Sequence, residues 1–111
     1  MPRSLTMLVE HGVDLDAVDY SGFAALHWAA MRGRLEDINL LLASGADPHV
    51  AGPQGGTPLH FVGGRDRVAE CIDALVEAGV DIDVTDLDGR TPLDWALDTY
   101  DESVVAALQR E

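Results

Sequence analysis

The chain has 111 residues, of which 47% are apolar, so we expect one folded domain with a modest core. Its formal net charge is −13 at pH 7. This charge argues against nucleic acids and anionic membrane surfaces as partners, because both are themselves negatively charged. No segment approaches the ~18 consecutive apolar residues of a membrane-spanning helix. The sequence shows no signal peptide, and its single cysteine, Cys71, has no internal disulfide partner, so we expect a cytoplasmic protein.

The first expected elements along the chain are a helix at about residues 4–11 and an Asp-rich extended finger that ends near Gly22. Two longer units follow, each with a short first helix, a second helix and another finger. The second helices stop at Gly45 and Gly79, and the last unit ends in a helix over about residues 102–110. Apolar residues stand at helical spacing in both second helices, at Leu35, Ile38, Leu41 and Leu42 and at Val68, Ile72, Leu75 and Val76.

Three sets of markers recur along the chain with spacings of 33 and then 34 residues. A fixed period of this length indicates a stacked solenoid, in which no unit buries its apolar face alone. The markers are Leu26-His27, Leu59-His60 and Leu93-Asp94, then Gly12, Gly45 and Gly79, and finally Gly22, Gly55 and Gly89.

Two of the first helices carry a start signal. Thr57-Pro58 and Thr91-Pro92 read as a capping hydroxyl followed by proline in the first turn, and a helix is expected from Thr57 to about Gly63. The second unit has Ala24-Ala25 at this place, which removes the cap at a cost of ~1 kcal/mol.

These residues resemble ankyrin repeats. The stretches "GGTPLHFVGG", "GFAALHWAAMRGRLEDINLLLASGAD" and "GRTPLDWAL" match the family pattern of Thr-Pro-Leu-His, an apolar helix pair and Gly-Ala-Asp. The resemblance implies an all-α solenoid of stacked helix-turn-helix units with protruding β-hairpin-like fingers. It also implies a non-catalytic module that binds other proteins.

The period divides the chain into four units, all within one domain. Residues 1–22 form a partial first repeat that lacks its inner helix, and residues 23–55 form the second repeat. Residues 56–89 form the third repeat with a one-residue insertion, and residues 90–111 form the C-terminal capping repeat.

His27 and His60 lie one period apart. The resemblance implies that this histidine bonds the backbone of the adjacent finger. Like the helix caps Thr57 and Thr91, both histidines are therefore expected to have a structural role. A zinc site would need three or four converging nitrogen or sulfur ligands, which one cysteine and scattered histidines do not supply. His11 and His49 are expected at the surface.

No cofactor or catalytic site is expected. The finger at residues 81–89 does not fit a calcium loop, because Val84 and Trp95 fall at its two end positions when Gly89 takes the glycine position. No serine has a His-Asp partner at a motif-like spacing. Cys71 lies in the apolar register of a helix and is expected to be a small core residue.

Two further ladders follow the period. The aromatic ladder Trp28, Phe61 and Trp95 is expected in the core between units. The arginine ladder consists of Arg32 and Arg65 with Arg34 and Arg67. It is expected just past the ends of the inner helices, where cations favour the helix dipole. The alternative is a basic edge opposite the acidic fingers, suited to carboxylate recognition.

By resemblance, partner contacts fall on finger tips and exposed inner-helix positions. We expect Tyr20, Phe23, Met31 and Arg32 to supply most of the affinity, and Asp86, Asp88 and Asp98 to steer a basic partner. The predicted binding residues are Tyr20, Phe23, Met31, Arg32, Gln54, Gly56, Arg65, Leu87, Asp88, Arg90, Asp98 and Thr99.

The main hypothesis for function is therefore a scaffold that binds a protein with a basic surface through its concave face. One alternative is an inhibitor or immunity-type protein that blocks a basic enzyme. Another is a self-associating structural module, whose exposed edge at Phe23 and Trp28 a second copy would cover. We expect a monomer or a weak homodimer.

Overall fold

The computed structural model describes residues 14–64 and 67–110. Within this part of the chain the fold is all-α and contains no strand, as predicted. Five α-helices and one short 3-10 helix follow one another in the order α2 (Ala25–Met31), α3 (Leu35–Ala43), η1 (Pro53–Gly55), α4 (Val68–Glu77), α5 (Pro92–Thr99) and α6 (Glu102–Arg110).

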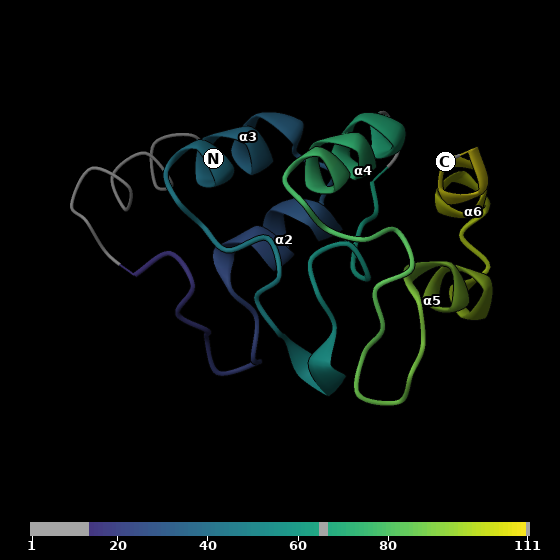
Figure 1. The fold of residues 1–111 in the computed structure, drawn as a ribbon, viewed down its shortest axis with the longest axis horizontal. Helices are drawn as coiled ribbons and strands as arrows, with labels where there is room; N and C mark the ends of the chain where they lie inside the picture. Colours follow the sequence, from purple (N-terminus) through teal and green to yellow (C-terminus); the bar gives the residue numbers. More distant parts are fainter. Residues whose placement is uncertain (1–13, 65–66, 111) are drawn as a thin grey trace.

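The helices form two layers (Figure 1). The outer layer contains α3, α4 and α6, in which α3 contacts α4 and α4 contacts α6. Helices α2 and α5 lie in the inner layer and contact α3 and α6 respectively. Three fingers extend from the inner layer on the side away from the outer helices (Figure 1). This arrangement is the predicted stack of helix pairs with projecting fingers.

Each finger is closed by one backbone hydrogen bond rather than by strand pairing. The N–H of Asp19 donates to the carbonyl of Phe23 at 2.9 Å, and the N–H of Gly52 donates to the carbonyl of Gly56 at 2.8 Å. In the last finger Asp86 N–H donates to the carbonyl of Arg90 at 2.9 Å. The fingers are therefore tight turns, and none of them forms a pair of β-strands in the described residues.

The core lies between the two layers. Ile38 and Leu41 of α3, and Ile72 and Leu75 of α4, have no exposed surface, as the helical spacing predicts. Cys71 is also fully buried, and its burial raises the pKa of the thiol to about 11. The thiol therefore stays protonated and fills space in the core, as predicted.

The third unit differs from its prediction, because its first segment is not an α-helix. Residues 58–61 form successive turns in which His60 N–H donates to Thr57 at 3.0 Å and Phe61 N–H donates to Pro58 at 3.1 Å. The N–H of Gly63 then donates to the carbonyl of Ala30 in the preceding unit at 2.9 Å. The bond between units replaces the one that would continue the helix, and the glycines that follow favour its end.

Gly63 and Gly64 allow two units to approach backbone to backbone. A Cβ on Gly63 would lie 2.9 Å from the carbonyl oxygen of Met31, and one on Gly64 would lie 2.9 Å from Cα of Gly33. Both contacts are too short for any side chain. Close approach, rather than exposure to a partner, therefore explains the glycine pair.

The helix starts follow the predicted caps in one case out of two. Thr91 Oγ1 accepts a hydrogen bond from Asp94 N–H at 3.2 Å, while Thr91 N–H donates to Asp94 Oδ2 at 3.0 Å. Thr57 instead contacts His60, with its N–H 3.0 Å from the ring Nδ1. At α2 the cap residue Ala24 provides no side-chain acceptor, as expected.

His27 and His60 join consecutive units. His27 Nε2 lies 3.0 Å from the carbonyl oxygen of Gly56, and His60 Nε2 lies 2.9 Å from that of Arg90. In both rings Nδ1 accepts a backbone N–H at 3.0 Å, from Ala24 and from Thr57. The proton therefore belongs on Nε2, which donates to the finger.

The structure predicts that His60→Ala destabilises the fold by about 2 kcal/mol, because two buried hydrogen bonds are lost and the Arg90 carbonyl loses one donor. Urea unfolding followed by circular dichroism measures the change. The matched control is His49→Ala, because the His49 side chain is exposed. An equal effect of the two substitutions would contradict a structural role for His60.

A second prediction concerns pH. Burial lowers the pKa of His27 below its ordinary value of 6.5, so the unfolded chain binds this proton more readily than the folded chain does. Stability from this group is present above pH 6.5 and is lost as the pH falls toward the lowered pKa of the folded state.

The unfolding free energy should therefore fall between about pH 7 and about pH 5, and it should fall less in His27→Gln. His49→Gln serves as the control and should retain the wild-type dependence. Identical pH dependence in wild type and His27→Gln would show that this histidine is not responsible.

Candidate functional site

The predicted contact residues of the finger tips lie at the surface. Tyr20 is fully exposed, and Leu87 is 83% exposed. Gln54 and Asp88 are also exposed. The N–H of Leu87 donates to the carbonyl of Gln54 at 3.0 Å, which joins the second finger tip to the third. The structure thus holds two of the three tips at a fixed spacing.

Gly56 is buried, and its prediction as a contact residue is wrong. A Cβ at this position would lie 2.7 Å from Phe61 and 3.1 Å from Trp95. The finger passes directly over these two rings, so Gly56 offers no surface to a partner. Only glycine fits between the finger and the rings.

The inner-helix positions are mixed. Arg32, Asp98 and Thr99 are exposed, whereas Met31 and Arg90 are half-buried. The guanidinium of Arg32 stacks over the ring of Trp28, 5.4 Å from its centroid. Arg90 forms an ion pair with Asp98, so both of these predicted contact residues already have a partner within the chain. Arg65 lies outside the described residues.

The arginine ladder does not behave as one group. Arg32 is the C-terminal cap of α2, where the helix dipole favours a positive charge, as expected. Arg34 and Arg67 instead stand at the N-terminal caps of α3 and α4, where the dipole disfavours a cation. The explanation by helix C-termini is therefore wrong for these two residues. Both side chains are exposed.

An aromatic row runs from the first finger to α5. The ring of Phe23 lies 5.1 Å from Phe61 in an edge-on contact, and Phe61 lies 4.7 Å from Trp95. Trp28 contacts Phe23 at 5.2 Å and is 36% exposed. The prediction that the aromatic ladder is core is thus wrong, because Trp28 is exposed and both Phe61 and Trp95 are half-buried and line a hollow.

Both tryptophans donate a hydrogen bond to an aspartate nine residues earlier. Trp28 Nε1 lies 2.8 Å from Asp19 Oδ2, and Trp95 Nε1 lies 2.7 Å from Asp86 Oδ2. In the middle unit Gly52 and Phe61 stand at the corresponding positions, so this unit has neither the carboxylate nor the indole N–H. The sequence reasoning missed these pairs, although the joint change of both residues was visible in the sequence.

Backbone donors hold the two aspartates in their charged form. The N–H of Phe23 lowers the pKa of Asp19, and Trp28 contributes to the same shift. The N–H of Arg90 lowers the pKa of Asp86, again with help from its tryptophan. Asp86 is only 8% exposed, so its prediction as a steering charge is wrong. Its carboxylate organises the finger instead.

A hollow of about 260 Å³ lies beside the aromatic row, between the turn of the third unit and the helices of the fourth. It forms where the third unit has a turn in place of a full inner helix. Its lining is mostly apolar and aromatic, and Asp101 is its charged member. The lining residues are Met31, His60, Phe61, Val62, Trp95, Ala96, Thr99, Asp101 and Val104.

Among residues 14–64 and 67–110, no group of three or more His, Cys, Asp or Glu side chains is arranged to hold a metal ion. In the same part of the chain, no helix is long and apolar enough to cross a membrane.

The sequence model of ankyrin repeats occurring in many copies matches residues 2–42, 26–68 and 65–108. The chain belongs to the ankyrin repeat family. Members of this family are, in general, non-catalytic modules for protein–protein interaction. The division into units at residues 22, 55 and 89 stays a prediction.

Several relatives share this repeat region. Human protein phosphatase 1 regulatory subunit 27 is 39% identical over 92 residues, which cover 83% of this chain and 59% of that protein. Human Rabankyrin-5 is 39% identical over 115 residues, covering 93% of this chain and 10% of that protein. Drosophila melanogaster E3 ubiquitin-protein ligase Ufd4 is 36% identical over 103 residues, which cover 88% of this chain and 4% of that protein. The chain thus spans about three-fifths or less of these relatives.

The finger geometry leads to a prediction for Asp86. Asp86→Ala removes the acceptor of the Trp95 indole and of two backbone N–H groups, from Asp88 and Arg90. We expect a red shift of tryptophan fluorescence and a lower urea midpoint, because the finger and the ring lose their shared anchor. Asp88→Ala, on the same finger, is the control and should change neither quantity. Wild-type values for Asp86→Ala would contradict the anchoring role.

Proposed function

We propose that this chain binds a partner protein with a basic surface through the face formed by its finger tips and inner helices. The observation that carries the proposal is the exposure of large apolar side chains at equivalent finger tips, Tyr20 and Leu87. Tyrosine and other large side chains supply much of the affinity at interface centres. Neither residue supports the fold by burial.

The spacing of the tips supports this proposal. The backbone bond from Leu87 to Gln54 fixes two fingers relative to each other. A surface that is already ordered loses less conformational entropy on binding, so a given contact area yields more affinity. The His27 and His60 hydrogen bonds serve the same end, because each holds a finger against the preceding unit.

The hollow beside the aromatic row supplies a place for a partner side chain. Met31, Phe61 and Trp95 line it, and Asp101 stands among the same lining residues. An apolar pocket with a carboxylate suits a side chain with an apolar stem and a cationic head, such as arginine. This chemistry agrees with a basic partner.

Exposed carboxylates add to the same preference. Asp88 lies at a finger tip, and Asp81 and Asp83 lie at the base of the same finger. Exposed charges of one sign steer a partner of opposite sign and raise the association rate more than they add affinity. A partner with lysine or arginine side chains opposite the fingers is the expected complement.

A second candidate function is regulation or inhibition of an enzyme by covering its surface. The observation that favours it is the similarity to a protein named as a regulatory subunit of protein phosphatase 1. The binding face would be the same, and the difference lies in the nature of the partner. Activity of a captured enzyme, measured with and without this chain, separates a regulator from a passive scaffold.

Affinity capture with mass spectrometry, using the whole chain as bait, tests the binding face. Replacing Phe23 would disturb the aromatic row, so the suitable variant is Tyr20→Ala with Leu87→Ala. We expect recovery of the partner to fall at least about tenfold, as for loss of interface anchors. The matched control is Asn39→Ala with Ser44→Ala, which removes two exposed side chains from the outer layer, outside both pockets.

Full capture by the Tyr20/Leu87 variant would contradict the proposed face. Salt provides an independent check, because raising it should slow association with a basic partner. An association rate unaffected by salt would contradict the steering role of the acidic fingers. Light scattering of the free chain separates a monomer from the weak homodimer, which stays a prediction.

A further inference from the structure

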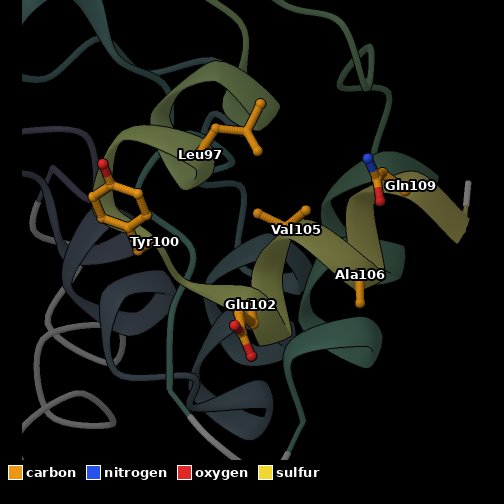
Figure 2. A pocket seen from close by; sticks show the side chains of 6 residues that line it. All are labelled: Leu97, Tyr100, Glu102, Val105, Ala106 and Gln109. Carbon is orange, nitrogen blue, oxygen red and sulfur yellow. The ribbon is translucent and has the colours of Figure 1, made fainter.

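A second apolar surface lies at the C-terminal end of the stack, between α5 and α6. Figure 2 shows Leu97 and Val105 facing a common groove, with Tyr100 at one end. The groove has a volume of about 250 Å³. Its lining residues are Leu97, Tyr100, Glu102, Val105, Ala106 and Gln109.

The repeat register shows that this groove corresponds to a buried interface elsewhere in the molecule. Counted from the capping residues at positions 24 and 91, Leu97 stands where Ala30 stands and Val105 stands where Ile38 stands. Ala30 and Ile38 have no exposed surface, and the third unit lies against their helices, since Gly63 N–H donates to the carbonyl of Ala30 and α4 contacts α3. Leu97 is 50% exposed. The groove therefore corresponds to a surface that, two units earlier, buries apolar side chains.

Another unit of the same kind does not fit there in the same way. Tyr100 occupies the position of Gly33, where a Cβ would lie only 2.7 Å from the carbonyl of Gly63 in the next unit. Leucine at 97 also replaces the small Ala30. These larger side chains keep a following backbone at a distance and leave room between α5 and α6 for side chains instead.

Charge argues against a second copy of this chain as the occupant. Each copy carries a formal net charge of −13. The one charged residue in the lining of the groove, Glu102, is acidic. Pairing two such grooves would bring like charges together, which is unfavourable.

We propose that this groove binds an amphipathic helix of a partner protein. Its apolar side chains enter between Leu97 and Val105, and its lysine or arginine side chains lie beside Glu102. An amphipathic helix in an apolar groove between helices is a common mode of recognition. The surface shares no lining residue with the hollow beside the aromatic row, so either proposal can fail alone.

Nuclear magnetic resonance titration tests the proposal with a defined probe. The probe is a peptide of about 15 residues, long enough to form a helix, with leucine on one face and lysine on the other. A peptide with glutamate in place of lysine is the control. We expect saturable shifts of the amide signals of residues 97–109 with the lysine peptide only.

The decisive variant is Ala106→Arg, because Ala106 is exposed and arginine there fills the groove without disturbing the core. The matched control is Asn39→Arg, which places the same charge at the equivalent exposed position of α3. Affinity for the lysine peptide should fall at least tenfold in Ala106→Arg relative to Asn39→Arg.

Three results of the titration would overturn the proposal. They are no saturable binding of the lysine peptide, shifts confined to the finger tips, and equal affinity of the two arginine variants. A dimer of the free chain that Ala106→Arg dissociates would also overturn it, because a second copy would then be the occupant. Sedimentation velocity of wild type and variant supplies that measurement.

Discussion

The structure depends on a hydrogen bond that repeats from unit to unit, from a histidine Nε2 to the carbonyl that closes the next finger. The carbonyl of Gly56 accepts both His27 and the N–H of Gly52, and the carbonyl of Arg90 accepts both His60 and the N–H of Asp86. One oxygen thus closes a finger and ties it to the preceding unit. Since the rings are buried, losing either bond would leave polar groups without a partner.

This tie places the finger tips that form the candidate binding face. Fingers contain no strand pairing in the described residues, so their position relies on the histidines, on the Asp86–Trp95 bond and on contacts between tips. The core beneath does not set this spacing by itself, because apolar packing has no direction. Hydrogen bonds to carbonyl groups are directional, and they set the spacing of the finger tips. The candidate binding face is therefore ordered in the free chain, which would reduce the entropic cost of binding a partner.

Most of the fold was predictable because the repeat places each residue type by period. The buried faces of α3 and α4 and the last helix follow from spacing within the sequence, whereas the histidine bonds were expected from the resemblance to ankyrin repeats. What failed depends on contacts between units. The turn at residues 58–61 forms because Gly63 bonds to Ala30, and Gly56 is buried because it lies over Phe61. The Gly63–Ala30 contact joins residues one period apart, and Gly56 also faces Trp95 of the next unit, so no local pattern reports either contact.

Amide hydrogen exchange of His60→Ala tests the central role of the histidine tie most directly, since it reports on each finger separately. The account predicts faster exchange at the Asp86 and Leu87 amides, whose hydrogen bonds depend on the position of the last finger. Amides of α3 should keep their wild-type protection, because this helix lies in the outer layer away from the finger. Unchanged exchange at Asp86 and Leu87 in the variant would contradict the account.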